Sequence, residues 1–282
     1  MTGGEAAPAA IAAPGRRNLV LRIVAAFVLA PSAIVIAYLG GWLWTALVTL
    51  AAIGLYVEWL GIVGEARRLA VAGSGAAALA AAGIASSFGR IELAAIALSL
   101  GLLAVAGLTP ERRIWAAAGL AYAGAAEQAS ILLRSDPVMG WTALMLVFLV
   151  VWVTDIGGYF AGRGIGGPKL WPRVSPNKTW AGAIGGFAAS LAVAAGFAAF
   201  GLGKTIPLLL LGSMLSIVSQ LGDLFESAVK RRFGVKDSSH VIPGHGGLLD
   251  RLDGFVAAVV LAAIFGLLRA GVDGAGRGLM IW

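Results

Sequence analysis

The sequence contains no cysteine and only two histidines among its 282 residues. The missing cysteine excludes a disulfide scaffold, a thiolate metal site and a cysteine nucleophile. Two histidines without any thiolate argue against a zinc site. Charge is also scarce, because Lys, Arg, Asp and Glu make up 12% of the chain, against about 25% in a soluble globular domain.

What the sequence has instead is apolar residues, which make up 59% of it, with a mean hydropathy of +0.90. Too few polar residues remain to cover a surface that faces water. This excludes a cytosolic enzyme and a disordered protein, and it predicts an all-α, polytopic helical membrane protein. The net charge of +7 is therefore interpreted through the positions of the basic residues, and not as a sign of nucleic-acid binding.

The apolar runs predict about nine transmembrane helices, each of the length that a bilayer requires. Residues 1–18 are predicted to form a flexible cytoplasmic tail, 19–134 an N-terminal scaffold of about five helices, and 135–282 a catalytic domain of about four helices. The first run is expected to be an uncleaved span and not a signal peptide, because many more spans follow. The predicted spans are 19–40, 42–63, 69–88, 91–108, 114–133, 138–161, 179–200, 206–229 and 252–270.

The basic residues give the predicted orientation. With a cytoplasmic N-terminus, sixteen of the 21 Lys and Arg residues lie inside and five outside, which agrees with the positive-inside rule for nine spans. Nine of the 21 fall in two inside loops, 162–178 and 230–251. The dense polar chemistry of the chain lies in or beside these loops, so they are the candidate functional segments.

Five carboxylates fall within or at the edge of predicted spans. An ionised carboxylate at the centre of a membrane helix costs about 2.5–3.5 kcal/mol, so each needs a partner, a cavity or a metal. Glu58 is interpreted as a structural pair with a basic residue, and Glu127 as a structural residue too. Asp155 precedes the first loop and belongs either to the site or to the scaffold. The other two, Asp223 and Glu226, precede the second loop.

The second loop is flanked by carboxylates that helices would align. Asp223, Ser227 and Lys230 are spaced i, i+4 and i+7, and Asp250 and Asp253 are spaced i and i+3, so each set shares a helix face. Carboxylate oxygens suit Mg²⁺, which proteins hold with one or two carboxylates plus substrate phosphates. Lysine and arginine suit the remaining phosphate charge. The pattern therefore predicts a site for magnesium and phosphate.

Three glycines, Gly244, Gly246 and Gly247, stand just before the last predicted span. A glycine-rich approach to a helix N-terminus exposes backbone N–H groups that bind anions. The alternative is an orientation loop whose basic residues are balanced by acidic ones. It explains neither the glycine cluster nor the carboxylates at both helix ends, so we favour the binding site.

The run from 227 to 253 resembles the signature of the phosphatidate cytidylyltransferase (CDP-diacylglycerol synthase) family. The upstream segment resembles the family less specifically, through Asp155, the run 159–163, the run 175–180 and Gly182. By itself the run 175–179 is typical of a turn that opens a helix, with Pro176 near the first turn. The signature matches without a gap at Ser227, Lys230, Arg231, Lys236, Asp237, Ser239, Pro243, His245, Gly246, Gly247, Asp250, Arg251 and Asp253.

The resemblance implies a nucleotidyltransferase of phospholipid biosynthesis. It would transfer CMP from CTP to phosphatidate, giving CDP-diacylglycerol and pyrophosphate, at the cytoplasmic face of a bacterial plasma (inner) membrane. The lipid phosphate is the nucleophile, and its second pKa near 6 makes much of it dianionic at neutral pH. No general base is then required, and we expect catalysis by positioning and charge neutralisation.

The resemblance also implies roles for single residues. In that family the acidic residues at the positions of Asp223 and Asp250 are associated with metal, so both are predicted to meet around one Mg²⁺. Asp253 is either a carboxylate beside these ligands or a weaker ligand itself. The number of cations, one or two, is left open. His245 either donates to a phosphate or closes the turn. Asp237 is expected to orient Lys236. The predicted phosphate-binding residues are Lys230, Arg231, Lys236 and Arg251, with backbone donors from Gly246 and Gly247. The residues predicted to bind the phosphatidate headgroup are Ser175, Asn177 and Lys178. Asp155 and Ser227 complete the predicted substrate-binding residues.

Two rival functions stay open at this point. A CTP-dependent polyprenol or phytol kinase would share the metal and phosphate chemistry but release CDP. A transporter or flippase would need broken helices at the midplane, for which Gly157 and Gly158 are a slight hint. The polar loops at the membrane edge disfavour the transporter. A homodimer is also possible, although Gly182 and Gly186 are expected to pack within the chain.

Overall fold

The computed structural model describes residues 31–65, 68–239 and 246–282, and nearly all of them are helical. Residues 31–39 form a helix, and the bounds of the longer helices that follow differ from the predicted spans by at most three residues. This confirms the polytopic helical fold. The helices are α2 (Gly41–Val63), α3 (Leu69–Ser87), α4 (Ile91–Leu108), α5 (Arg113–Ser135), α6 (Gly140–Gly164), α7 (Trp180–Ala199), α8 (Thr205–Arg232), α9 (Leu249–Ala270), a 3₁₀ turn η1 (Val272–Gly274) and α10 (Ala275–Met280).

Seven of the described helices are long and apolar enough to cross a membrane, namely α2, α3, α4, α6, α7, α8 and α9. Helix α5 spans 23 residues but is less apolar, with buried Glu127 and Ser130 among its residues. Part of the first predicted span, and the whole predicted tail at 1–18, lie outside the described residues. The number of spans and the cytoplasmic N-terminus therefore stay predictions.

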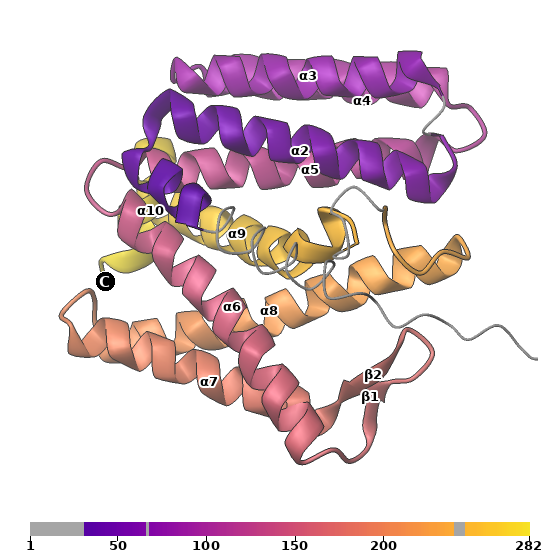
Figure 1. Ribbon diagram of the computed structural model, residues 1–282. Coiled ribbons are helices and arrows are strands. Elements are labelled where there is room, and N and C mark those ends of the chain that lie inside the picture. The colour runs from indigo at the N-terminus through magenta and orange to yellow at the C-terminus, as the bar shows by residue number, and fades with distance from the viewer. Residues whose placement is uncertain (1–30, 66–67, 240–245) are drawn as a thin grey trace, which may run out of the picture.

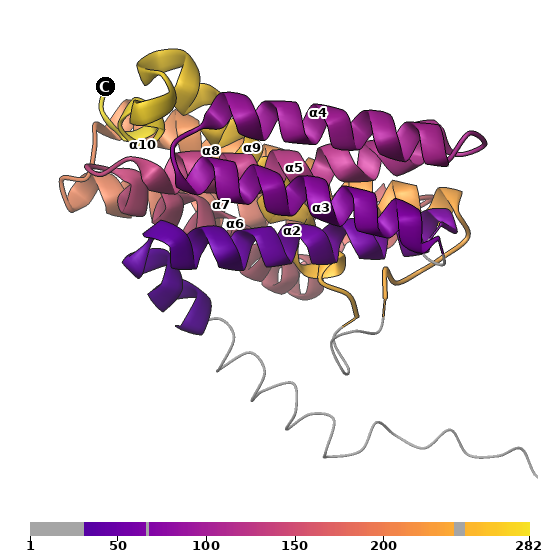
Figure 2. The same ribbon diagram turned by 90° about the horizontal axis from the view of Figure 1, so that it is seen from above.

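The helices form layers. In Figure 1, α3 and α4 lie together at the top, α2 and α5 form the next layer, and α9 and α8 follow below. Helix α7 lies at the bottom, and α6 runs diagonally from near α10 down to the hairpin. Figure 2, seen from above, shows α3 and α4 as separate neighbours. The contacts agree with this order, because α5 packs on α9, α9 on α8, and α7 on both α8 and α6. The layering places the C-terminal half against a scaffold made by the N-terminal half.

Glycines set the closest helix pair, α6 and α7. A Cβ added at Gly186 would lie 2.5 Å from the carbonyl oxygen of Thr154, and one at Gly182 would lie 2.9 Å from that of Gly158. Only glycine lets the two backbones approach this closely. The prediction that Gly182 and Gly186 pack within the chain is confirmed. Their contacts hold the start of α7 against the part of α6 that carries Asp155.

The first loop forms a β-hairpin, which the sequence did not predict. Strand β1 (Lys169–Trp171) pairs antiparallel with β2 (Ser175–Thr179). Pro176 lies in a strand and not in the first turn of a helix; a two-stranded ribbon has only edge strands, where proline is tolerated. The helix begins at Trp180, because the Thr179 hydroxyl accepts a hydrogen bond from the Gly182 N–H at 3.1 Å and so caps α7.

A buried carboxylate organises the end of the molecule near α10. Asp136 accepts hydrogen bonds from the N–H groups of Val138 (2.8 Å) and Met139 (3.1 Å), ahead of α6. It also accepts two from Arg277, through the backbone N–H at 2.7 Å and the guanidinium Nε at 3.0 Å. Burial opposes ionisation of Asp136, but the bonds from Arg277, Val138 and Met139 outweigh it and lower its pKa below the ordinary value.

We predict that Asp136→Asn lowers the free energy of unfolding by about 1–3 kcal/mol, because bonds to a charged acceptor are lost. The pKa of Asp136 is lower in the folded than in the unfolded protein, so the bonds stabilise the fold above the unfolded pKa, about 3.9. This stabilisation is lost as the pH falls through the folded pKa. Thermal unfolding in detergent should show the gap between wild type and variant closing below pH 4. A gap that is constant with pH would contradict the prediction.

Candidate functional site

The two motif segments meet at one end of the bundle, away from α10 (Figure 1). Lys178, in β2 of the hairpin, forms an ion pair with Asp223 on α8. Arg231, at the end of α8, donates from Nε to the carbonyl oxygen of Val174 at 3.4 Å. Segments far apart in the sequence are thus joined through both side chains and backbone. The fold brings the first loop and the second loop into one site.

A close crossing of α8 and α9 brings two predicted carboxylates together. A Cβ added at Gly222 would lie 2.7 Å from the carbonyl oxygen of Asp253, and one at Gly254 would lie 3.1 Å from that of Ser219. The missing side chains let the two helices touch at this level. Asp223 and Asp253, each next to one of these glycines, therefore face the same region.

Three carboxylates and one lysine make up this part of the site. Asp253 interacts electrostatically with Asp223 and Asp155, and Asp155 interacts with Asp223. Lys178 lies near enough to act on both Asp155 and Asp253 while it pairs with Asp223. Because three carboxylates gather around a single lysine, the cluster carries an excess of negative charge when all three are ionised, and a bound cation would favour that state.

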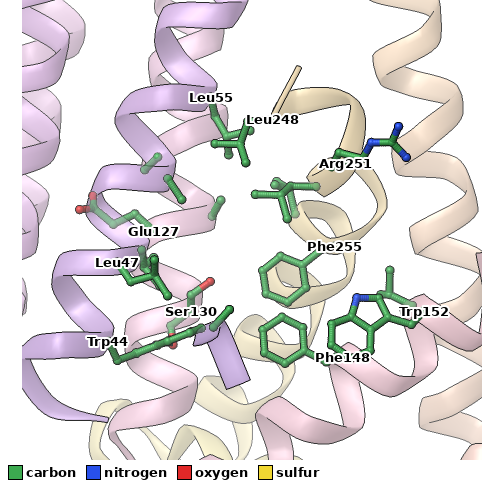
Figure 3. A pocket seen from close by; sticks show the side chains of 18 of the residues that line it. Trp44, Leu47, Leu55, Glu127, Ser130, Phe148, Trp152, Leu248, Arg251 and Phe255 are labelled. Carbon is green, nitrogen blue, oxygen red and sulfur yellow. The ribbon is translucent and has the colours of Figure 1, made fainter. Parts of the chain in front are cut away.

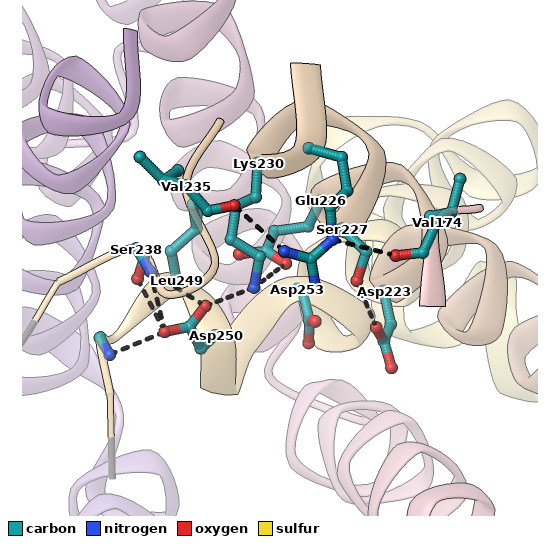
Figure 4. A network of polar contacts seen from close by, with 12 residues as sticks. Val174, Asp223, Glu226, Ser227, Lys230, Val235, Ser238, Leu249, Asp250 and Asp253 are labelled. Carbon is teal, nitrogen blue, oxygen red and sulfur yellow. Dashed lines mark hydrogen bonds and ion pairs between the residues drawn. The ribbon is translucent and has the colours of Figure 1, made fainter. Parts of the chain in front are cut away.

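A second cluster surrounds Lys230 near the end of α8. Its ammonium lies 2.7 Å from Glu226 Oε2 and 2.6 Å from Asp250 Oδ1 (Figure 4). Glu226 and Lys230 are both buried, and Glu226 is only 1% exposed. The lysine thus pairs with a carboxylate on each of two helices, and it fastens the end of α8 to the start of α9.

Asp250 is further bound by the loop that precedes it. It accepts hydrogen bonds from the N–H of Ser238 at 3.1 Å, the Ser238 hydroxyl at 3.1 Å and the N–H of Gly247 at 2.9 Å. Its carboxylate therefore faces Lys230 and the loop, whereas that of Asp223 faces Lys178 and Ser227. In Figure 4 the side chain of Asp253 is drawn between those of Asp250 and Asp223.

These positions bear on metal binding. Within residues 31–65, 68–239 and 246–282, no three carboxylate or histidine side chains are arranged to hold a metal ion by themselves. The oxygens of Asp223, Asp155 and Asp253 nevertheless fit a hard divalent cation by charge and donor type. Mg²⁺ commonly takes one or two carboxylates and completes its shell with water and substrate phosphates.

The other predicted residues are spread around the two clusters. Arg231, Lys236, Asp237, Arg251 and Asn177 are exposed, whereas Ser175, Ser227 and Gly246 are partly buried. Arg231 also donates to the carbonyl oxygen of Val235 at 3.3 Å. His245 lies outside the described residues. The exposed cations are accessible to a charged ligand, and among the carboxylates Asp155 and Asp237 are exposed whereas Asp223, Asp250 and Asp253 are partly buried.

An apolar cavity of about 590 Å³ adjoins the site, between α2, α5, α6 and α9. Asp155 and Arg251 belong to its wall, and Leu248, at the foot of α9, lines it as well (Figure 3). Most of the remaining lining is apolar, with Trp44, Phe148, Trp152 and Phe255 among it. The cavity has the size of a small-molecule pocket, about 300–1,000 Å³, and it joins an apolar space to charged groups.

Two residues of the site were misjudged from the sequence. Glu58, expected to pair with a basic residue, instead reaches the loop before α9, where Ser238 and Ser239 donate to it. Glu226 was noted as a carboxylate in a span but received no role, although it is one of the two partners of Lys230. The spacing i, i+4 between Glu226 and Lys230 was the signal that could have identified this pair.

Gly247→Ala tests how tightly this part of the site is packed. A Cβ at Gly247 would overlap the Ser238 hydroxyl and the Glu58 carboxylate, so we expect a loss of about 1–3 kcal/mol in stability. Thermal unfolding in detergent measures the effect. Gly61→Ala on α2 is the matched control, because nothing lies within 4 Å of its added Cβ, and it should leave stability unchanged or slightly raised. Equal melting temperatures for both variants would refute the packing described here.

Comparison with known proteins agrees with this geometry. A model of the cytidylyltransferase family matches residues 20–268. The chain is 56% identical over 165 residues to a phosphatidate cytidylyltransferase of Brucella suis. The matched segment makes up 57% of this chain and 60% of that protein. It is 48% identical over 148 residues to the enzyme of the same name from Staphylococcus haemolyticus, a match over 51% of this chain and 55% of that protein. It is 45% identical over 131 residues to that of Bacillus subtilis, a match over 45% of this chain and 48% of that protein. The matches thus span about half to three fifths of these relatives.

Proposed function

Since this chain belongs to the cytidylyltransferase family, we propose that it transfers CMP from CTP to phosphatidate and releases pyrophosphate. The proposal rests on one observation above all: two charged segments converge beside an apolar cavity at one end of a membrane bundle. Lys178 and Asp223 join the segments, and Asp155 and Arg251 join them to the cavity. Such a site presents charged groups and apolar space to the same reactants.

The two substrates require a site of this kind. Phosphatidate carries acyl chains that cannot leave the bilayer cheaply, because each buried CH₂ contributes about 0.8 kcal/mol. CTP is highly charged and cannot enter the bilayer. The reaction must therefore occur where the membrane meets water, with the apolar cavity open to the acyl chains and the exposed arginines and lysines open to CTP.

The reaction balances without a proton acceptor. An oxygen of the phosphatidate phosphate attacks the α-phosphorus of CTP, and the bond from that phosphorus to the bridging oxygen of the β-phosphate breaks. The lipid phosphate is largely dianionic at neutral pH, since its second pKa is about 6. The chain's task is to hold two anionic groups together, so catalysis comes from positioning and from fixed positive charge.

The residues divide this task by position. Lys178, beside Ser175 and Asn177 in β2, receives the phosphatidate headgroup. Arg231, Lys236 and Arg251 are exposed and bind CTP phosphates, whereas Lys230 is buried. Guanidinium and ammonium groups suit phosphate oxygens by geometry and charge. Asp237 orients its neighbour Lys236.

We propose that Mg²⁺ binds at the carboxylates of Asp223 and Asp253, with Asp155 beside them. Asp250, which the sequence assigns to the same Mg²⁺, is bonded to Lys230, Ser238 and Gly247 and would be a ligand only if it exchanged some of these bonds. When bound there, Mg²⁺ would neutralise part of the negative charge of the CTP phosphates. The excess negative charge around Lys178 supports this assignment, because ion pairing with one lysine leaves two carboxylates uncompensated.

The protein is integral to a membrane, and the relatives named above come from bacteria. We therefore assign it to the bacterial plasma membrane, with the hairpin and the second loop facing the cytoplasm, where CTP is found. This sidedness agrees with the excess of basic residues in the two loops. A place in phospholipid biosynthesis follows from the proposed product, CDP-diacylglycerol.

Product analysis tests the proposal directly. Purified protein with labelled CTP, phosphatidate and Mg²⁺ should form labelled CDP-diacylglycerol and pyrophosphate. Asp223→Asn and Asp250→Asn should each lower the rate by about 100-fold without loss of folding, because fixed charges of the site are removed. Asp273→Asn, in the exposed turn η1 at the other end, is the matched control and should keep full activity. Release of CDP would favour the kinase, and full activity of both site variants would remove these residues from the mechanism.

Metal removal makes a separate prediction. A chelator should stop turnover, and added Mg²⁺ should restore it, because the carboxylates of Asp223, Asp253 and Asp155 repel CTP phosphates unless a cation neutralises them. The rate is followed as pyrophosphate release against free Mg²⁺ concentration. Turnover that continues at full rate in the chelator would rule out the metal assignment while leaving the family membership untouched.

A further inference from the structure

We infer that Glu58, on α2 of the N-terminal scaffold, is a positioning residue for the site: it holds Ser238 and Ser239 and the first turn of α9, and through them Asp250. This inference rests on the proposed function for its kinetic consequences only. Glu58 is 6% exposed and lies 180 or more residues from each of its hydrogen-bond partners in the sequence.

Each carboxylate oxygen of Glu58 accepts one hydroxyl and one backbone N–H. Oε1 accepts from the Ser239 hydroxyl at 2.7 Å and the Leu248 N–H at 2.8 Å. Oε2 accepts from the Ser238 hydroxyl at 2.9 Å and the Leu249 N–H at 2.8 Å. Four donors thus surround the buried carboxylate, and among the described residues they take the place of the basic partner that the sequence suggested.

The two backbone bonds cap α9 from another helix. The first N–H groups of a helix have no partner within it, and they favour a nearby negative charge. Leu248 is the N-cap of α9 and has no capping side chain, so the cap is supplied by Glu58 across the helix interface. Loss of this carboxylate would leave the first turn of α9 free to shift.

Asp250 stands in that first turn, and Ser238 connects it to Glu58. The Ser238 hydroxyl lies 2.9 Å from Glu58 and 3.1 Å from Asp250, while the Ser238 N–H donates to Asp250. A hydroxyl carries one proton, so it donates to one carboxylate at a time. Gly247 fits between the two acids only because it has no side chain. Glu58 therefore determines where the loop places Asp250 and, through it, Lys230.

The molecule contains a matched control at its other end. Asp136 is also a buried carboxylate that accepts two backbone N–H bonds ahead of a helix and two further bonds, here from Arg277. Its partner Arg277 belongs to α10, which lies away from the hairpin (Figure 1). Asp136→Asn and Glu58→Gln each replace a buried carboxylate that accepts four hydrogen bonds by its amide, at different ends of the molecule. Asp136 also loses an ion pair with Arg277, so Asp136→Asn is a demanding control for stability.

The test compares steady-state kinetics of Glu58→Gln, Asp136→Asn and wild type in detergent, normalised to folded protein. We expect Glu58→Gln to lower kcat/KM for CTP by about 10- to 100-fold, as for other partners that orient a ligating side chain. The KM for phosphatidate should stay within about twofold, because Lys178 and its strand do not contact Glu58. Asp136→Asn should lower the melting temperature but leave kcat/KM for CTP and KM for phosphatidate unchanged. Wild-type kinetic constants for Glu58→Gln would overturn the inference.

A second measurement separates this inference from the proposed function. Hydrogen exchange of the amides of Leu248 and Leu249 should become faster in Glu58→Gln and stay unchanged in Asp136→Asn, whatever reaction the protein catalyses. If wild type makes no CDP-diacylglycerol, the proposed function fails and exchange alone decides the inference. Unchanged exchange refutes it. Should Glu58→Gln fail to fold, Glu58→Asp, which keeps the charge but is one methylene shorter, should give the same changes to a smaller extent.

Discussion

The site depends on the ion pairs of one buried lysine. Lys230 lies in the last turn of a long membrane helix, α8. Its ammonium pairs with Glu226 of the same helix and with Asp250 of the next. Taking the lysine away would leave the carboxylates of Glu226 and Asp250 close together without a compensating positive charge, which is far more costly than losing a surface pair. The pairing therefore fixes how the end of α8 meets the start of α9, and the loop between them is built around that junction.

The division between scaffold and site is less sharp than the order of the chain suggests. The charged motif segments belong to the C-terminal half, yet the cap of α9 comes from α2 through Glu58. The cavity beside the site is likewise shared, since α2 and α5 form one wall and α6 and α9 the other. The buried polar groups of a loop at the edge of a bilayer need hydrogen-bond partners, and neighbouring helices provide those that the loop itself lacks.

Helices supply most of the fold, but glycines decide where the functional groups meet. At Gly222 and Gly254 the backbones of α8 and α9 touch, which places Asp223 and Asp253 in the same region. At Gly182 and Gly186 the start of α7 is held against α6, and the hairpin that precedes it brings Lys178 to Asp223. A cytidylyltransferase acting on a lipid would need this arrangement, because charge must be concentrated without a large extramembrane domain.

The sequence by itself determined the helical membrane fold, the helix bounds to within a few residues and the two segments that carry the site, because hydropathy and motif spacing are local properties of the chain. The small hairpin was missed, since its short strands carry proline and charge and have no clear alternation. Only the tertiary structure decided which charges pair: Asp250 with Lys230, Asp223 with Lys178, and Glu58 with backbone N–H groups about 190 residues away. The physical reason is that a buried charge takes whatever donor the packing brings near it, and packing joins residues that no spacing in the sequence connects.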